Sequence, residues 1–145
     1  MPFIGLMGAP TATNLVRAHI VTGRPEYLRA AVLACQSGAG ANPCNVCYTT
    51  GVGTSAPRHP LVVDMRITGQ APPPGITVLG PMNLALTKDD WQVKLAAPFC
   101  YPPPLDWPTT ESYFDVFWLP MICEFTVHQT LGPNIYAWGY LAARR

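Results

Sequence analysis

The sequence predicts a mainly α-helical single domain with long ordered loops. Apolar residues recur at helical spacing in two segments near the start and again at the end of the chain. Between them, glycine and proline are frequent, and no sustained period of either 3.6 or 2 appears. The chain has 145 residues, the size of one ordinary domain, and 49% of them are apolar, which argues against disorder.

Residues 11–38 are expected to form an αα-hairpin. Thr11 is available as the N-cap of the first helix, and Gly23 is expected to stop it. The second helix is expected to begin at Pro25 and end at Gly38. The apolar faces consist of Ala12, Leu15, Val16 and His19 in the first helix and of Leu28, Ala31, Val32 and Cys35 in the second.

Residues 39–87 are expected to form a long ordered loop, with short extended pieces at residues 61–63 and 76–79. Such a long loop inside a compact domain is usually functional.

Residues 88–145 are expected to hold loops and the C-terminal helices. Asp89 and Asp90 suit the start of a short helix within residues 88–97, and a proline-rich loop follows. Helical periodicity resumes at residue 120, and Pro133 is expected to end or kink one helix before the last.

The composition excludes several classes of protein. Nine lysines and arginines balance eight aspartates and glutamates without any basic run, so nucleic acid is a poor partner. No apolar run approaches the ~18 residues of a membrane span. Pro2 and Pro10 interrupt the first ten residues, which carry no basic residue, so no signal peptide is expected.

Charged residues make up only 12% of the chain, too few to cover the surface of so small a domain. We therefore expect a homo-oligomer, most simply a two-fold dimer joined through helix faces. Together, seven apolar helix residues are expected to provide more apolar surface than the helices can bury against each other. They are Leu15, Val16, Leu28, Val32, Ile135, Trp138 and Leu141.

The most specific string runs from residue 40 to residue 81. It contains, in order, Asn42-Pro43, Tyr48-Thr49-Thr50-Gly51-Val52-Gly53 and Pro57-Arg58-His59-Pro60. This arrangement resembles the substrate-binding loop of family 9 glycoside hydrolases, which are endoglucanases and cellobiohydrolases. The resemblance implies that Tyr48, Arg58 and His59 bind an oligo- or polysaccharide. The alternative is a rigid loop in which Arg58 and His59 hold the loop's own carbonyl groups.

Glycines 51 and 53 allow close backbone approach, while a guanidinium and an imidazole offer planar donors to sugar hydroxyls. Many family members carry further histidine and arginine residues where this chain has Leu61-Val62-Val63. Asp64 and Arg66 either replace those polar contacts or form a salt bridge with each other on an extended segment.

A second segment, residues 108–143, resembles the closing part of the same family, where an Asn-Glu pair begins the last inner helix. Glu124 then takes the place of the catalytic general acid, and Cys123 that of the asparagine. A glycosidic oxygen leaves only when it is protonated, and apolar neighbours favour a protonated carboxyl group. The alternative is an ordinary glutamate that interacts with free N–H groups at a helix start.

The resemblance covers about residues 25–143 and implies a partial (α/α)6 barrel, a remnant of the six-hairpin glycosidase type with long ordered loops. It also implies acid/base hydrolysis of β-1,4-glucan or a related β-glycoside, with inversion. The family's catalytic base belongs to an Asp-x-x-Asp motif that this chain lacks, so Asp64, Asp115, Glu111 or another subunit would have to replace it. The alternative is a non-catalytic remnant that binds glycan or only self-assembles. Family members are usually secreted, and the localisation of this chain stays open.

Carboxylates and aromatic rings also gather between residues 106 and 118. Trp107 and Tyr113 are candidates for stacking on sugar rings, although a core or a subunit interface needs the same residue types. The other members of this cluster are Asp106, Glu111, Phe114, Asp115, Phe117 and Trp118.

Cys44 and Cys47 have the spacing of half a zinc site, but no second close pair exists, so neither a metal nor another cofactor is predicted. The five cysteines leave at least one thiol without an intrachain disulfide partner. His19 and His128 are expected to be packed histidines.

Overall fold

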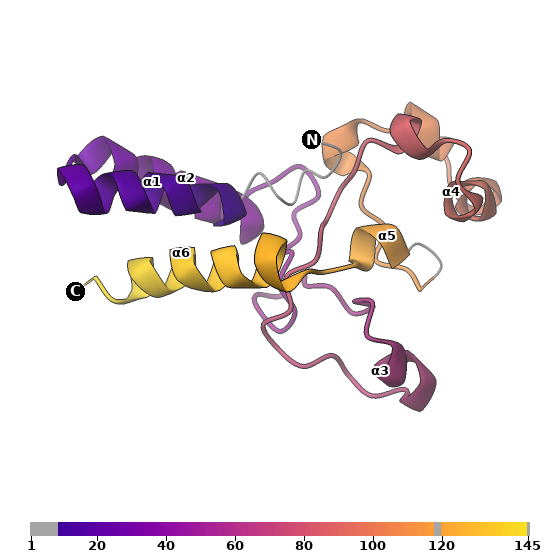
Figure 1. The fold of residues 1–145 in the computed structure, drawn as a ribbon. Helices are drawn as coiled ribbons and strands as arrows, with labels where there is room; N and C mark the ends of the chain where they lie inside the picture. Colours follow the sequence, from indigo (N-terminus) through magenta and orange to yellow (C-terminus); the bar gives the residue numbers. More distant parts are fainter. Residues whose placement is uncertain (1–8, 118–119, 145) are drawn as a thin grey trace.

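The computed structural model describes residues 9–117 and 120–144. These residues are mainly helical (Figure 1), which confirms the prediction of a mainly α-helical chain. The helices are α1 (Ala9–Thr22), α2 (Pro25–Gly38), α3 (Val63–Thr68), α4 (Trp91–Ala96), α5 (Pro120–Cys123) and α6 (Gly132–Ala142). Within the described ranges, strand pairing is limited to one antiparallel bridge between Thr49 and Thr77.

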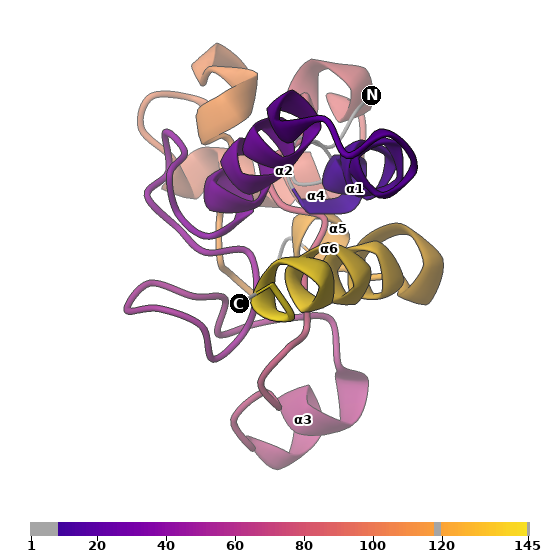
Figure 2. The same cartoon turned by 90° about the vertical axis from the view of Figure 1, so that its left-hand side faces the viewer.

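Helices α1 and α2 form the predicted hairpin, and α6 packs beside it (Figures 1 and 2). Gly23 ends α1 in a left-handed conformation with φ of 68°, and Pro25 occupies the first turn of α2, as predicted. Thr11 lies inside α1 and does not cap it, because the helix already includes Ala9. The core between the three helices consists of Ala12, Val16, Ala31, Cys35 and Ala137.

A polar cluster links the C-terminal end of α6 to α1. Tyr140 Oη lies 2.6 Å from His19 Nδ1 and accepts a hydrogen bond of 2.7 Å from Arg144 Nη1. His19 is buried, which confirms the prediction for this residue. His128 is exposed, so the prediction that it is packed was wrong.

The segment between α2 and α4 is mostly loop, but it contains α3, which was not predicted. A helix of six residues is too short to show an apolar period. Val62 is extended, as expected, whereas Val63 already belongs to the helix, which ends at Gly69 with φ of 69°. Helix α4 begins later than residue 88, after Asp90 caps it by accepting 2.8 Å from the Gln92 N–H.

A second core holds this region together. It consists of Met82, Leu84, Val93, Ile122 and Cys123, with Ala96, Tyr113 and Phe114 packed against it. The long loop is also linked to α6, because the side-chain amide of the buried Asn134 donates a hydrogen bond of 2.8 Å to the hydroxyl of Thr77. The Thr77 hydroxyl also forms a hydrogen bond of 2.9 Å with Thr49 Oγ1. The long loop is therefore attached to both cores and held in one arrangement.

The predicted boundary at Pro133 is confirmed. A π-helical turn, Val127–Leu131, precedes α6, and Pro133 lies in the first turn of α6, where a missing N–H costs least. Thr126 caps the π-helical turn, since its Oγ1 accepts 3.1 Å from the Gln129 N–H.

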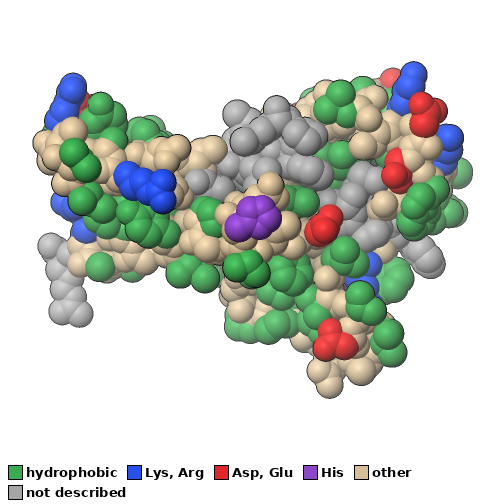
Figure 3. All heavy atoms as spheres, viewed as in Figure 1, with side chains coloured by type: hydrophobic (Ala, Val, Ile, Leu, Met, Phe, Trp, Pro, Cys, Tyr) green, Lys and Arg blue, Asp and Glu red, His purple; other side chains and the backbone are tan. Residues whose placement is uncertain are grey.

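The helix faces expected to form a dimer are partly used within the chain. Val16 is fully buried and Leu15 and Leu141 pack against the first core, so these three were wrongly assigned to a surplus surface. Ile135 and Trp138 remain 68% and 38% exposed. Charged side chains are scattered between apolar areas on the face seen in Figure 3. Oligomer formation stays a prediction. None of the described helices is both long and apolar enough to cross a membrane.

Candidate functional site

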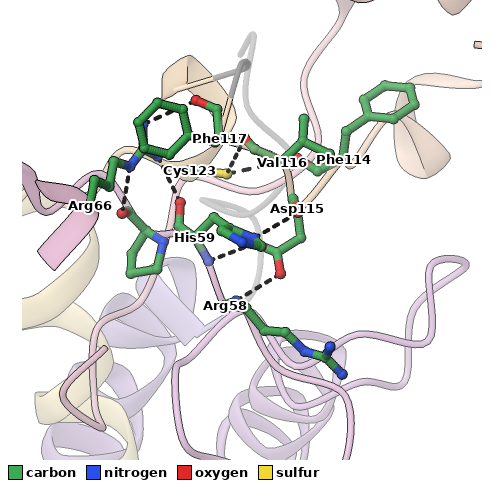
Figure 4. Close-up of polar contacts among 9 residues, drawn as sticks. Arg58, His59, Arg66, Phe114, Asp115, Val116, Phe117 and Cys123 are labelled. Carbon is green, nitrogen blue, oxygen red and sulfur yellow. Dashed lines mark hydrogen bonds and ion pairs between the residues drawn. The ribbon is translucent and has the colours of Figure 1, made fainter. Parts of the chain in front are cut away.

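The Arg58–His59 segment of the long loop is held by Asp115 (Figure 4). The Arg58 N–H donates to Asp115 Oδ2 at 2.7 Å, and the His59 N–H donates to Oδ1 at 3.0 Å. The His59 ring lies 3.0 Å from the Asp115 carbonyl oxygen through Nδ1. Because a carbonyl only accepts, Nδ1 carries the proton, and Nε2 is left for another contact. Asp115 thus fixes both the backbone and the ring.

Arg66 of α3 holds the other side of the same segment. Its Nη2 donates to the His59 carbonyl at 2.8 Å, and Nε and Nη1 donate to the carbonyls of Pro60 and Phe117 at 3.3 and 3.1 Å. The guanidinium carbon also lies 4.5 Å from the centre of the Phe117 ring. The expectation of an extended segment with an Asp64–Arg66 salt bridge was wrong, because both residues lie on α3 and Arg66 donates to carbonyl groups.

Arg58 and His59 line two pockets. One pocket, of about 360 Å³, is also lined by Thr54, Ser55 and Tyr113. The other, of about 450 Å³, is also lined by Arg66, Gln70 and Phe117 among other residues. Both volumes lie within the range typical of small-ligand sites. The predicted sugar-binding residues Arg58, His59, Arg66 and Tyr113 are therefore brought together.

Tyr48, in contrast, lies in the interior of the loop. It is only 4% exposed, and its ring packs edge-on against Tyr113, with the ring centres 5.3 Å apart. Burial raises the pKa of both phenols far above the ordinary value. The Tyr113 hydroxyl is buried without a hydrogen-bond partner among the described residues. Tyr113 lines the first pocket, whereas Tyr48 packs behind it and is too deeply buried to contact a sugar.

Glycine is required at position 51 by the loop itself. Its φ is 71°, and an added Cβ would lie 2.7 Å from Pro74 Cβ. The close approach predicted for this glycine is therefore to another part of the chain. The adjacent Thr50 hydroxyl donates to the Pro73 carbonyl at 2.6 Å and accepts from the Ile76 N–H at 2.9 Å, which closes the loop around Gly51.

Glu124 lies where the two halves of the long loop meet the end of α5. The Leu61 N–H donates to the Cys123 carbonyl at 2.9 Å, and the Leu79 N–H donates to the Glu124 carbonyl at 2.7 Å. A further bond of 3.1 Å joins the Gly80 N–H to the Ile122 carbonyl. The backbone at Glu124 is thereby fixed from two sides.

The local structure around Glu124 differs from the prediction in two respects. Glu124 does not begin a helix, because it follows α5 and Thr126 caps the next turn. Its side chain is exposed, so its apolar sequence neighbours do not surround it. Cys123 points inward instead: it is fully buried, and burial raises the pKa of its thiol to about 12.

The remaining predicted carboxylates do not converge on one point. Asp64 and Glu111 are exposed, on α3 and on a short 3-10 turn respectively, and both oxygens of Asp115 are occupied by amides. Trp107 donates from Nε1 to the Pro102 carbonyl at 2.6 Å and packs on Phe114, with the ring centres 4.9 Å apart. Trp107 and Phe114 of the aromatic cluster therefore contribute to packing within the chain. Trp118 lies outside the described residues.

In the described part of the chain, no three His, Cys, Asp or Glu side chains are grouped so as to hold a metal ion. The five cysteines, including Cys44 and Cys47, are free thiols.

Sequence reasoning named Asp115 as a candidate catalytic base and missed that it holds the loop through the Arg58 and His59 amides. The contact spans 57 residues, and no local pattern carries that information.

Comparison of the chain with protein-family models finds no match, and comparison with curated proteins finds no match either. Function has to be inferred from the residues and their geometry.

Proposed function

We propose that this chain is a glycoside hydrolase of the family 9 type, acting on β-1,4-glucan or a related β-glycoside, with a partial (α/α)6-barrel fold. The observation that carries the proposal is the placement of Glu124. Backbone hydrogen bonds at Ile122, Cys123 and Glu124 join it to both halves of the loop that presents Arg58 and His59. Glycosidic cleavage uses a carboxyl group that protonates the leaving oxygen, and Glu124 is the residue proposed for this role.

In the proposed reaction, Glu124 donates its proton to the glycosidic oxygen while the bond from that oxygen to the anomeric carbon breaks. Water attacks the anomeric carbon from the opposite face and passes a proton to a second carboxylate. Arg58 donates hydrogen bonds to sugar hydroxyls, and Nε2 of His59 accepts one from a sugar hydroxyl. Asp115 is unsuited to the role of base because two backbone amides occupy its oxygens. Asp64, Glu111 or a carboxylate of another subunit is left for this step.

The test is Glu124→Gln, which keeps the shape of the side chain and removes the acidic proton. The matched control is Glu26→Gln, on the exposed surface of α2. Release of reducing ends from cellohexaose should fall by about 10²- to 10⁴-fold in Glu124→Gln, the usual contribution of a general acid, and stay unchanged in the control. Equal rates in the two variants would show that Glu124 is not the acid.

One observation favours a second candidate, a non-catalytic glycan-binding domain. Among the described residues that line the two pockets, Asp115 is the one carboxylate, and its oxygens are already used. Hydrolysis needs two available carboxyl groups, whereas binding needs none. Saturable binding of cellohexaose by the native chain, without any release of reducing ends, would support this candidate against the first.

A further inference from the structure

The two pockets beside Arg58 hold more positive than negative charge. Arg58 lines both pockets and Arg66 lines the larger one, whereas Asp115 is the single carboxylate of the described residues around them. The carbonyl groups that bind Arg66 accept from three of its five N–H donors and do not cancel its charge. Asp115 is close to His59, with 3.6 Å between Oδ1 and Nδ1.

The Arg58 guanidinium is available to a ligand. The contact of Arg58 with Asp115 goes through its backbone N–H, and Figure 4 shows the side chain extending away from that carboxylate. The residue is exposed, and its guanidinium forms no hydrogen bond or ion pair with another described residue. Because Asp115 holds the backbone at this position, the base of the side chain is fixed while its charged end faces solvent.

We propose that Arg58 makes the site selective for acidic glycans, namely β-1,4-linked chains whose sugars carry a carboxylate at C6. This inference rests on the proposed function, since it takes the two pockets as the sugar-binding site. A guanidinium pairs with a carboxylate through two parallel hydrogen bonds, a geometry that a neutral hydroxymethyl group does not offer. The larger pocket, of about 450 Å³, provides room for a sugar ring beside Arg58.

The expected preference is modest and sensitive to salt. An exposed ion pair of this kind gives up to about a fivefold gain in affinity. Salt screens such a pair, so the gain should be largely lost when the Debye length falls to a few ångströms, at about 1 M salt.

The experiment compares cellohexaose with a cello-hexauronate of the same linkage and length. Affinities are measured by titration calorimetry in a Glu124→Gln background, so that the sugars stay intact. At low salt, where screening is weakest, the uronate should bind more tightly than the neutral sugar by a factor near the upper limit of about five. The ratio should fall to about one in Arg58→Gln and remain near five in Arg29→Gln, a control on the exposed surface of α2.

A ratio of one in the Glu124→Gln protein would overturn the inference, and cellohexaose hydrolysis by the native chain would leave the proposed function standing. A preference that survives Arg58→Gln would overturn the assignment to Arg58. If neither sugar binds, both the inference and the proposed sugar-binding site are refuted.

Discussion

Replacing Asp115 with asparagine tests whether one carboxylate organises the loop. In the native protein, its two oxygens accept from the Arg58 and His59 amides at 2.7 and 3.0 Å. Asparagine keeps one acceptor and places an NH₂ group against the other amide, so that two donors face each other. The substitution therefore removes one charge-assisted hydrogen bond and leaves a backbone N–H unpaired.

The magnitude follows from these two losses. A hydrogen bond to a charged group contributes about 1.5–3 kcal/mol, and an unpaired donor costs about 1–3 kcal/mol when it is buried and less at exposed residues such as Arg58 and His59. The side chain of Asp115 is 24% exposed, which favours the lower part of both ranges. We expect a loss of about 2–3 kcal/mol in the free energy of unfolding. With a urea dependence of about 1–3 kcal/mol per molar, the midpoint should fall by roughly 1 M.

The assay is urea unfolding, followed by titration with cellohexaose. Asp89→Asn is the matched control, because Asp89 is 84% exposed and its ion pair with Lys94 is long, at 3.9 Å. The control should change stability by less than about 0.5 kcal/mol. Equal urea midpoints for the two variants would refute the inference that Asp115 stabilises the loop through the Arg58 and His59 amides. If Asp115→Asn loses much stability but binds cellohexaose with unchanged affinity, Asp115 stabilises the loop, but the loop is not the sugar-binding site.

Two further predictions concern backbone strain and a buried thiol. Gly51→Ala should cost at least about 1 kcal/mol more than Gly69→Ala, because both positions have positive φ but only the former meets Pro74; equal urea midpoints would contradict this. Cys123 has a folded pKa of about 12 against 9.0 for a free thiol, so the unfolded chain ionises first as pH rises. The free energy of unfolding should therefore fall by about 1.4 kcal/mol per pH unit between pH 9 and 12 from this group alone. Urea midpoints measured over this range should fall less steeply in Cys123→Ala, and an unchanged slope would contradict the assignment.

The sequence by itself determined the elements whose boundaries depend on neighbouring residues. Gly23 and Pro25 separate α1 from α2 because one accepts a left-handed conformation and the other has no N–H to lose. Pro133 marks the start of α6 because, like Pro25, it has no N–H to lose in a first helical turn. Asp90 marks the start of α4 by capping it. These effects act over three or four residues, so a linear pattern is enough to predict them.

The chemistry of the site was decided only by the tertiary structure. The resemblance to family 9 glycoside hydrolases suggested Arg58, His59 and Glu124 as candidates, but their exposure depends on segments that are distant in sequence. Asp115 holds the loop because folding brings it to the amides of Arg58 and His59, which are 57 and 56 residues away in the sequence. Tyr48 was expected at the sugar and is buried against Tyr113, since an aromatic ring suits a binding surface and a core equally well. The burial of Tyr48 and the long-range hydrogen bonds of Asp115 depend on how distant segments pack together, which local spacing does not determine.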